Sequence, residues 1–523
     1  MDSNHLIKKY SDKYVDYLRD ESRLAGEAES ISFPRSQSEI KEILKYLHSK
    51  NTSITIQGGR TGITGGAVPQ GGHILNLSRM NKITGLRFDR SKEDCFILVQ
   101  PGVTLHELSM FSENFDAGVE NWDRDSIKAL EFLKSNEKYF LPPNPTETAA
   151  TIGGIVSCRA SGSRSYKYGA LNKYINKLSI VFSNGDSFSI ERGKIFARNG
   201  VFSFKTDSGR NIAGVLPNRK NIKVKNACGY NVSKNMDIID IFIGMEGTLG
   251  VITEIELKLK KLPLHIWSLT IFLPDEKNAV EFVHKMQNIE KNRPVAIEYY
   301  SEEALLFLKR MKEACGIFNN ITGIPDKKCT AVYVEFHGNS EEELSETVFS
   351  LSGTIENFGG SDSDTWIGTE KAEVKKMKDF RHAVPEAVNN YIDIMRGKGK
   401  EIRKLGTDMS VPRNKLFFTM DMYKKDLEKE NLEHIIFGHI GDAHLHVNIL
   451  PRSKNEYDRG KNLYKKWALK IVNMGGSVSA EHGIGKEKKD FYRIMYSMKE
   501  IEQMYAFKLL FDKKGILGTG NLF

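Results

Sequence analysis

The chain has 523 residues, about three times the length of a typical domain, so we expect two or three domains. Hydrophobic residues make up 40% and charged residues 27%, which excludes a disordered chain, a collagen and a coiled coil. The formal net charge is +9, but the basic residues are not interleaved with aromatic residues in any nucleic-acid-binding pattern, so no nucleic-acid partner is expected.

Residues 1–31 carry both charge signs and predict a helical lead-in. They contain no apolar core with a small-residue cleavage site, so no secretion signal is expected. No window of the sequence offers the roughly 20 uncharged apolar residues that span a bilayer. The five cysteines are scattered without a Cys-x-x-Cys pair, which favours reduced thiols and excludes an iron–sulfur cluster and a cysteine-based zinc site. We therefore expect a cytoplasmic protein, with peripheral association with the inner face of a membrane as the alternative.

The next elements alternate between helix, strand and loop. A capping box of Ser36 and Glu39 predicts a helix over 36–51. The polar stretch from about 112 to 140 is typical of an insertion that is helical in places. Strand-like runs lie at 53–57, 73–78 and 95–102, and the glycine-rich loop GGRTGITGG lies at 58–66.

Four segments rich in small residues indicate a bound ligand. Glycine permits a positive φ and a close approach of the backbone, so successive N–H groups can surround an anion such as a pyrophosphate. The loop 58–66 contains neither a Gly-x-Gly-x-x-Gly fingerprint nor a Walker sequence, and alone it could be a tight surface turn. Segments 144–169, 226–232 and 244–253 share its character. Together the four favour a long, flat ligand that lies against the backbone.

Beyond residue 264 the pattern changes to strands separated by amphipathic helices. Strand-like runs lie at 268–273, 296–300 and 331–336, and helices follow them from about 276, 302 and 340. This order predicts a small α+β layer with helices on one face, and a domain boundary near residue 263.

The strongest chemical signal is the segment FGHIGDAHLHVNIL at 437–450. His444 and His446 alternate along an apolar strand, so their side chains lie on one face, and His439 comes just before them. Glu481 follows another strand after a predicted helix that stops at 475–476. Imidazoles that converge with a carboxylate form a typical divalent-metal site. From spacing alone, His444 and His446 are the favoured ligands.

A first resemblance to a known family rests on five motifs in order: QGGRTGITGGAV, GGHILNLSRMNKI, PPNPTETAATIGG, KYG and GMEGTLGVIT. Over 32–260 the chain resembles the FAD-binding domain of the p-cresol-methylhydroxylase (PCMH) or vanillyl-alcohol-oxidase type. The resemblance implies FAD between two α/β subdomains, with its pyrophosphate at 58–66. Some members attach flavin covalently to His or Cys, neither of which occurs in 58–66, so non-covalent FAD is expected. The residues implied at the flavin are Gly58, Gly59, Arg60, Thr61, Gly62, Thr64, Gly65, Gly66, Pro143, Thr146, Thr151, Gly153, Gly154, Tyr168, Gly169, Glu246, Gly250 and Ile252.

A second resemblance rests on GHIGDAHLHVN and SAEHGIG. These motifs are similar to the carboxy-terminal domain of FAD-linked D-2-hydroxyacid dehydrogenases, which include D-lactate dehydrogenases and the catalytic subunit of glycolate oxidase. In that family the first and last histidines and the glutamate hold a zinc-type divalent ion. They map to His439, His446 and Glu481. The middle position is often Asn in the family and is His444 here, so its role stays open.

The second resemblance also implies roles for residues around the metal. His482, next to Glu481, is the implied general base for the substrate hydroxyl. Arg381 corresponds to the family arginine that binds the substrate carboxylate, and Asn448 corresponds to a substrate-contacting asparagine. Lys404 is a weaker candidate for the same carboxylate.

Together the resemblances imply an α+β fold. A two-subdomain PCMH-type FAD-binding domain is followed by an antiparallel-sheet α+β cap domain and a helical carboxy-terminal segment. The expected divisions are a lead-in at 1–31, the FAD-binding domain at 32–262, the cap with the metal block at 263–450, and a segment at 451–523 that completes the active site. The chain ends GILGTGNLF where the family commonly ends near Asn-Pro-Gly-Lys, so flavin contacts from the tail stay open.

The implied function is oxidation of a D-2-hydroxy acid to the 2-oxo acid, with hydride passing to FAD and electrons to a separate acceptor. D-lactate is favoured because the sequence shows no second basic residue for a distal carboxylate, and glycolate and D-2-hydroxyglutarate are the alternatives. Two other classes stay open: a non-catalytic flavin electron-transfer protein, and a transferase resembling alkylglycerone-phosphate synthase. The transferases carry consecutive histidines where this chain has Ala480-Glu481-His482. A sugar-lactone oxidase would leave the histidine cluster unexplained.

The electron acceptor is a separate partner, because the sequence holds no iron–sulfur or haem ligands. Oxygen, a quinone, a cytochrome and an electron-transfer flavoprotein are the candidates. Between Lys371 and Lys425 there are 14 Lys/Arg against 7 Asp/Glu. A local excess of this size can steer an anionic substrate, an acidic protein or a membrane surface.

Overall fold

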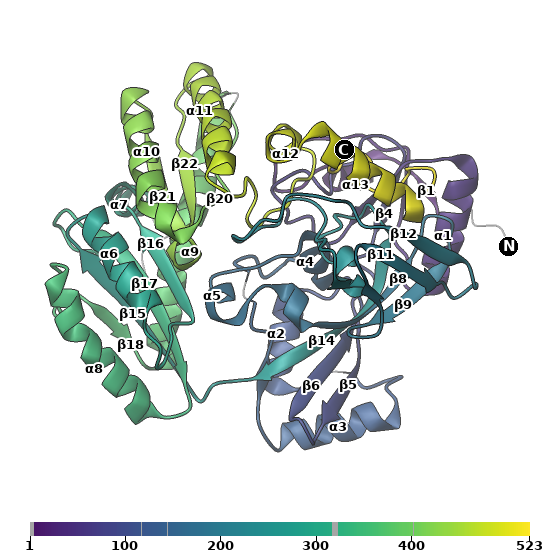
Figure 1. The fold of residues 1–523 in the computed structure, drawn as a ribbon, viewed down its shortest axis with the longest axis horizontal. Helices are drawn as coiled ribbons and strands as arrows, with labels where there is room; N and C mark the ends of the chain where they lie inside the picture. Colours follow the sequence, from purple (N-terminus) through teal and green to yellow (C-terminus); the bar gives the residue numbers. More distant parts are fainter. Residues whose placement is uncertain (1–4, 117, 144, 316–322, 401) are drawn as a thin grey trace.

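The computed structural model describes residues 5–116, 118–143, 145–315, 323–400 and 402–523 (Figure 1). Three larger antiparallel or mixed sheets and their covering helices make an α+β fold, as predicted. Among the described residues, no helix combines the length and the apolar character needed to cross a bilayer.

The first sheet has four strands and lies near the amino terminus. Its order is β1 (Lys8–Lys9), β2 (Ser30–Ser32), β4 (His73–Asn76) and β3 (Ile54–Gln57), and β2, β4 and β3 run parallel. Helix α1 (Gln37–Lys50) begins where predicted, because the Ser36 hydroxyl accepts a hydrogen bond from the Glu39 N–H. Its apolar stripe packs against β3 and β4, so β3 and the glycine loop that follows it are held on a rigid support.

The lead-in corrects one prediction. Residues 1–31 were expected to be helical, but their described part contains β1, the start of β2 and only one helix, a 3-10 helix at Asp12–Leu18. Tyr14 and Tyr17 pack against Phe33, and the Asp20 carboxylate accepts a hydrogen bond from the Ala67 N–H at the end of the glycine loop. The conformation of this segment is therefore determined by its contacts with Phe33 and the end of the glycine loop rather than by helical periodicity.

The second sheet is antiparallel, with the order β5 (Ile83–Asp89), β6 (Asp94–Val99), β14 (Val251–Lys261), β8 (Ile175–Val181) and β9 (Ser187–Glu191). β7 (Tyr139–Phe140) pairs with β14. The stretch predicted as a partly helical insertion holds α3, which packs on β5. The remaining elements of this half are α2 (Leu105–Asn114), α3 (Arg124–Lys134), α4 (Ile152–Cys158), α5 (Ser165–Tyr168), 3-10 helices at Leu171–Tyr174 and Ile238–Phe242, β10 (Phe196–Ala197), β11 (Val201–Lys205), β12 (Asn211–Val215) and β13 (Met236–Asp237).

The third sheet has eight antiparallel strands and follows a short connection at 262–264 (Figure 1). Its order is β18 (Trp366–Gly368), β15 (His265–Leu273), β17 (Thr330–Gly338), β16 (Ala296–Tyr300), β21 (His434–His439), β22 (His444–Ile449) and β19 (Leu405–Gly406), and β20 (Met409–Ser410) pairs with β22. The associated helices are α6 (Glu276–Gln287), α7 (Glu302–Cys315), α8 (Glu341–Asn357), α9 (Lys371–Gly397), α10 (Leu416–Lys429) and α11 (Lys454–Asn473).

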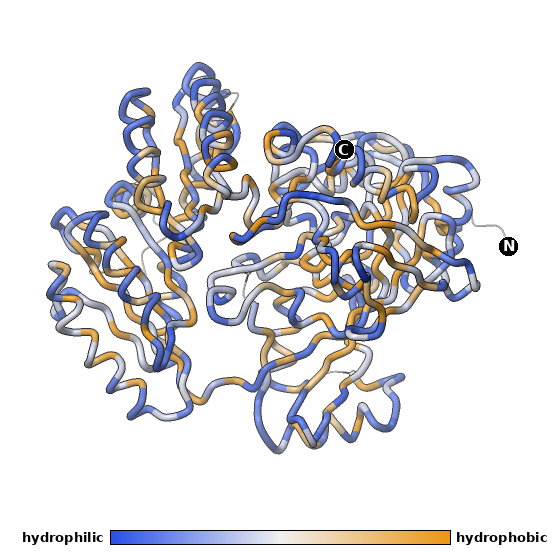
Figure 2. Tube along the Cα trace, in the orientation of Figure 1, coloured by the Kyte–Doolittle hydropathy of each residue, from blue (hydrophilic) through white to orange (hydrophobic). Residues whose placement is uncertain are grey.

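Helices cover both faces of this third sheet, which corrects the expected single helical face. Residues of α6 and α8 join one apolar cluster with Leu269 and Val334, whereas residues of α7 and α9 join another with Phe272 and Tyr333. Successive strand residues point to opposite faces, and both sets are apolar here, so each face needs a cover. In Figure 2 the hydrophilic residues gather on the outer turns of α8, α10 and α11.

The carboxy-terminal segment returns to the first half of the molecule. α12 (Lys489–Met495) and α13 (Met498–Phe511) lie beside the amino-terminal sheets in Figure 1, and α13 packs against β12. The Ile54 N–H donates to the Ile516 carbonyl at the edge of β3. Residues 474–488 therefore cross from the third sheet to the glycine loop, and they carry Glu481 and His482 with them.

Candidate active site and metal centre

Three histidines and one glutamate converge where β21 and β22 meet the carboxy-terminal crossing. One ligand atom from each of His439, His444, His446 and Glu481 lies within 4.8 Å of all the others. The antiparallel pairing sets His439 opposite His444, and His446 lies on the same face two residues later. The centroid of the His444 ring is 5.3 Å from that of His439 and 4.6 Å from that of His446. Two ligands on one zinc-type ion lie about 3 to 4 Å apart, so this donor set fits a divalent transition metal.

Side chains from the first half of the chain hold Glu481. Its Oε1 accepts a hydrogen bond of 2.9 Å from the Ser161 hydroxyl and one of 2.5 Å from Lys225 Nζ. Its Oε2 lies 3.1 Å from His439 Nε2. Oε2 is therefore the oxygen that faces the histidines.

Asp408 is completely buried beneath this centre and organises it. It accepts hydrogen bonds from the backbone N–H of His482 at 3.0 Å and from Lys488 Nζ at 2.7 Å. Its Oδ2 is 3.4 Å from His482 Nδ1, and its Oδ1 is 3.0 Å from His444 Nε2. The His482 side chain is 30% exposed and its ring stacks on His446 with a centroid distance of 5.5 Å. One nitrogen of His482 thus lies towards Asp408 and the ring keeps an accessible edge.

The ionisable groups of the centre are strongly perturbed. Burial alone would lower the pKa of His439, but the carboxylates of Glu298 and Glu481 raise it to about 9. Burial lowers the pKa of His446 to about 3, helped by the neighbouring histidines, and that of His482 to about 4. Burial opposes ionisation of Glu481, yet His439 and Lys225 hold its pKa well below the ordinary value. At neutral pH, His446 and His482 therefore have free lone pairs.

We expect the metal-free chain to be most stable near pH 6.5. Burial lowers the pKa of His73, His444, His446 and His482 to between about 3 and about 4, so the folded state binds fewer protons than the unfolded state as the pH falls below about 6.5. Stability is lost in that acid window. His439 acts in the opposite direction, because its pKa is raised to about 9. It stabilises the folded state below about pH 6.5, and this stabilisation is lost as the pH rises through 9.

The acid limb should be the steeper one, because several buried histidines act there, His382 with a pKa lowered to about 4 among them, whereas His439 alone among the histidines has its pKa raised in the described part of the chain. Urea unfolding of chelator-treated protein between pH 4 and pH 9 measures both limbs. His73 lies in β4 away from the cluster, so His73→Asn should flatten the acid limb without altering metal binding. An acid limb that stays flat in the parent chain would contradict the expected protonation of these histidines.

Arg381 lies on α9 and contacts the loop that precedes α5. It is 7% exposed, its Nη1 donates to the Ser163 hydroxyl, and its Nε makes no hydrogen bond among the described residues. The neighbouring Arg164 Nε donates to Glu335 Oε1 at 2.7 Å, and the Nη2 of Arg164 is buried without a partner in the described part of the chain. Two buried guanidinium groups with unused donors make this side of the site suitable for an anion.

Asn448 and Lys404 both lie close to Gly406. A methyl group on Gly406 would be 2.7 Å from Asn448 Oδ1 and 3.7 Å from Lys404 Cε. Asn448 is 1% exposed and its Oδ1 makes no hydrogen bond to the described residues. Lys404 Nζ donates to Asn389 Oδ1, and burial lowers its pKa to about 8. Both predicted residues therefore lie near the histidine cluster, because Asn448 follows His446 on β22.

The glycine loop is arranged to receive an anion. Within the described residues, the backbone N–H groups from Arg60 through Gly66 donate no hydrogen bond, although Thr64 and Gly65 are buried. A Cβ on Gly62 would meet nothing within 4 Å. Consecutive free N–H groups in a turn form an anion-binding concavity, so the residues fit a pyrophosphate.

Some of the other residues predicted at the flavin contact this loop or the segment bonded to it, and the rest lie elsewhere in the first half of the chain. The Thr151 hydroxyl accepts hydrogen bonds from the N–H groups of Gly59 and Gly154. Glu246 has a φ of 50° and accepts from the N–H groups of Ile484 and Gly485. Pro143 is buried, Thr146 is exposed, and Gly153 lies close to Pro101. The Tyr168 hydroxyl is hydrogen-bonded to His337, and Gly169 has a φ of 82°. Gly250 and Ile252 pack on β8 beside Ile180.

Arg60 points away from the loop's free N–H groups. Its guanidinium lies over the Tyr17 ring, 4.5 Å from the centroid, and donates to the Asp16 carbonyl. Its N–H remains part of the unpaired series.

The carboxy-terminal residues close over the same loop. Asn521 Nδ2 donates to the carbonyls of Gly66 and Glu246, and Lys486 Nζ donates to Asn521 Oδ1. The Thr64 hydroxyl donates to the His482 carbonyl, and the Thr64 carbonyl accepts from the N–H groups of Lys486 and Glu487. The glycine loop and the Glu481–His482 segment are therefore joined directly.

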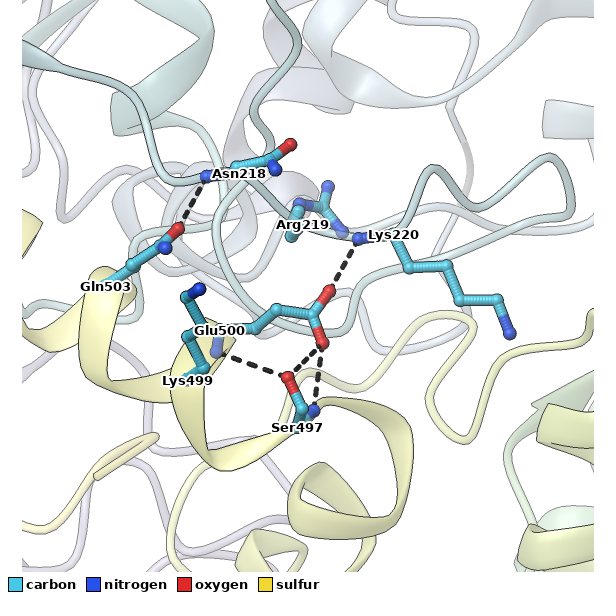
Figure 3. A pocket seen from close by; sticks show the side chains of 7 residues that line it. All are labelled: Asn218, Arg219, Lys220, Ser497, Lys499, Glu500 and Gln503. Atoms are coloured by element: carbon cyan, nitrogen blue, oxygen red, sulfur yellow. Dashed lines mark hydrogen bonds between the residues drawn. The ribbon is translucent and has the colours of Figure 1, made fainter.

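A separate hollow of about 410 Å³ lies where α13 begins (Figure 3). Its Glu500 accepts hydrogen bonds from the Ser497 hydroxyl and the Lys220 N–H, and its Gln503 accepts from the Asn218 N–H. These polar groups cap a helix and fix a loop, so the hollow has no arrangement for catalysis.

Sequence reasoning missed several residues of the site. Lys225 immediately precedes the segment 226–232 that was singled out, and Ser161 and Ser163 lie within 144–169. The available signal for Glu298 and Glu335 was a single charge inside each of the apolar strands β16 and β17, because a buried charge needs a partner.

Comparison with known proteins bears directly on these features. Residues 28–122 match the family described as FAD binding domain, and residues 262–522 match the family described as FAD linked oxidases, C-terminal domain. The chain belongs to the FAD-linked oxidases. This FAD-linked oxidase is an enzyme, an oxidoreductase that binds FAD.

Two relatives match this oxidase over nearly its whole length. It is 25% identical to a D-2-hydroxyglutarate dehydrogenase of Stutzerimonas stutzeri, over 94% of this chain and 90% of that protein. It is 26% identical to a D-lactate dehydrogenase of Anaerostipes hadrus, over 97% and 92%. Among solved structures, p-cresol methylhydroxylase with substrate bound has a TM-score of 0.67 at 15% identity, over 99% of this chain and 94% of that chain. The predicted PCMH-type fold is confirmed.

Proposed function

We propose that this oxidase uses FAD and a divalent metal ion to oxidise a D-2-hydroxy acid to the 2-oxo acid. One observation carries the proposal. A cluster with the donor chemistry of a transition-metal site, His439, His446 and Glu481, lies beside the accessible imidazole of His482, which is neutral at pH 7. The relatives named D-lactate and D-2-hydroxyglutarate dehydrogenase support the substrate class.

The residues around the substrate have distinct tasks. In this proposal Arg381 binds the carboxylate of the substrate with its unpartnered Nε–H among its donors, and Asn448, whose Oδ1 is also unpartnered among the described residues, orients the substrate. A divalent ion, zinc in our proposal, would be held by the histidines and Glu481, and when bound it lowers the pKa of the 2-hydroxyl group. FAD would lie non-covalently against the loop 58–66, and when bound it takes the two electrons that leave C2 with its hydrogen.

His482 removes the hydroxyl proton. Its pKa of about 4 keeps the imidazole neutral at pH 7, so it can accept a proton from the substrate. Asp408 lies 3.4 Å from Nδ1, which favours the orientation in which Nε2 is the accepting atom. The charge that develops on His482 is compensated by the Asp408 carboxylate, which Lys488 also binds.

D-lactate is the substrate we favour, and glycolate and D-2-hydroxyglutarate are the alternatives. The buried Arg164 beside Arg381 supplies the second cation that the sequence did not reveal, and its bond to Glu335 already offsets that charge. A dicarboxylate is favoured over lactate only if Arg164 can leave Glu335. Measurement of kcat/KM for D-lactate, glycolate and D-2-hydroxyglutarate under the same conditions decides the order of substrate preference.

The test is an anaerobic absorbance scan of purified, FAD- and metal-loaded protein before and after substrate. Bleaching of the flavin bands by D-lactate and not by L-lactate is the expected result. Bleaching by glycolate or D-2-hydroxyglutarate alone would keep the chemistry and change the substrate. An oxidised flavin spectrum that no D-2-hydroxy acid alters would overturn the proposal.

Electrons then pass to a separate acceptor, for which we propose an electron-transfer flavoprotein, a quinone or a cytochrome. The basic stretch 371–425 contributes exposed lysines on α9 and the loop after it, among them Lys375, Lys376 and Lys398. We place the protein in the cytoplasm, with this basic surface available to an acidic partner or an anionic membrane.

A further inference from the structure

The role of His444 is the question that the predicted ligand set leaves open. Its side chain is completely buried, and its ring lies between those of His439 and His446. Its donor atom lies within 4.8 Å of those of His439, His446 and Glu481, the three residues predicted as metal ligands.

Each of the three histidines has an outer partner on one ring nitrogen. His439 Nδ1 lies 2.8 Å from Glu298 Oε1, and His446 Nδ1 donates to the Thr407 carbonyl at 2.9 Å. His444 Nε2 lies 3.0 Å from Asp408 Oδ1. A metal-ligating histidine typically has its second nitrogen bound to a carboxylate or carbonyl group, which fixes the tautomer and the ring orientation. By this criterion His444 is placed like the other two, with Nδ1 as the nitrogen left for a ligand.

A purely structural role explains His444 less well. Asp408 already accepts hydrogen bonds from the N–H groups of Glu481 and His482, from the Ser479 hydroxyl and from Lys488. The Nδ1 of His444 makes no hydrogen bond with any described residue, and its Nε2 shares Asp408 Oδ1 with the Glu481 N–H. A buried imidazole nitrogen without a hydrogen-bond partner destabilises the fold, because its lost hydration is not replaced. A metal ion at the cluster removes that cost.

We propose that His444 is a direct ligand, so that the metal site contains three imidazoles and one carboxylate. The proposal rests on the metal-dependent function proposed above. Three nitrogen donors and one carboxylate oxygen favour a borderline divalent ion such as Zn²⁺ or Co²⁺ over Mg²⁺ or Ca²⁺. With four protein ligands, the substrate can bind the ion only if the coordination number rises to five or six. We therefore expect the site to bind an ion that can increase its coordination number from four.

The experiment measures metal binding rather than turnover. Chelator-treated, FAD-loaded protein is titrated with Zn²⁺ against a competing chelator, and with Co²⁺ by visible absorption. The variants are His444→Asn and His446→Asn. The matched control is His434→Asn, which changes a histidine on the same strand as His439 but outside the cluster. Flavin content and thermal unfolding report whether each variant is folded.

We expect His444→Asn to weaken Zn²⁺ binding by more than about 100-fold, since loss of an outer partner alone costs about 10- to 100-fold. The Co²⁺ spectrum should change in intensity and position, as in His446→Asn, and His434→Asn should match the parent in both respects. Affinity and spectrum unchanged in His444→Asn, with both altered in His446→Asn, would overturn the proposal and leave a three-ligand site. No metal bound by the parent chain would overturn both this proposal and the metal part of the proposed function.

Zn²⁺ X-ray absorption of the unmodified protein provides a second, variant-free measurement. Multiple scattering from imidazole rings counts the histidine ligands. Three imidazoles are expected, and two would contradict the proposal even if His444→Asn failed to fold.

Discussion

Replacement of His482 by glutamine is expected to lower kcat by a factor of about 10² to 10⁴, the usual contribution of a positioned general base. Glutamine keeps a polar side chain but cannot take a proton from the substrate hydroxyl. His482 lies outside the four-residue donor cluster, so metal content should stay unchanged unless the second group that it forms with Asp408 and Glu481 holds the ion, and KM should change little. Anaerobic stopped-flow measurement of flavin bleaching gives both constants.

His106→Gln is the matched control, because His106 is an exposed histidine on α2. It should bleach at the parental rate. A decrease in kcat of less than about fivefold in His482→Gln would assign the proton to another group, since a general base contributes at least about 10²-fold.

Replacement of Arg381 by methionine is the second change with a large expected effect. Removal of one partner of a buried, hydrogen-bonded charge pair costs about 2 to 5 kcal/mol. We therefore expect kcat/KM to fall by a factor of about 30 to 5,000, mostly through a higher KM, because each 1.4 kcal/mol is tenfold. Arg381→Lys should recover only part of this loss, because a lysine cannot offer two parallel N–H donors to a carboxylate.

The direct measurement is the dissociation constant of the 2-oxo acid product, read from its perturbation of the flavin spectrum. Arg396→Met alters an exposed arginine on the same helix, α9, and should bind the product like the parent chain. Equal affinity in Arg381→Met would place the substrate carboxylate elsewhere, and the buried Arg164 would be the next residue to change.

Elements with a clear local period could be predicted closely from the sequence. β16 has the bounds that its alternating apolar run indicates, and α1 starts at the capping serine. The carboxy-terminal helix at 454–473 ends just before the Gly475-Gly476 pair that was expected to stop it. The lead-in and the two-sided helical cover of the third sheet could not be predicted, because both depend on which distant surface a segment meets.

The residues of the candidate metal cluster could be predicted from the sequence, but the residues that hydrogen-bond to them could not. His439, His446 and Glu481 come together because β21 and β22 form a hairpin and the crossing segment passes its end. Lys225 and Ser161 belong to the other half of the molecule, more than 250 residues from Glu481 in each case. No periodicity links residues that far apart, so only the folded chain reveals that they bind the same carboxylate.

Thr64 connects the two binding centres, since it bonds both to His482 and to the amides of Lys486 and Glu487. A ligand that orders the glycine loop must therefore also order the segment that carries Glu481. By thermodynamic reciprocity, whatever factor FAD adds to metal affinity, the metal adds to FAD affinity, typically equivalent to about 1 to 3 kcal/mol. If the proposed metal binds, loss of either cofactor would therefore weaken the binding of the other.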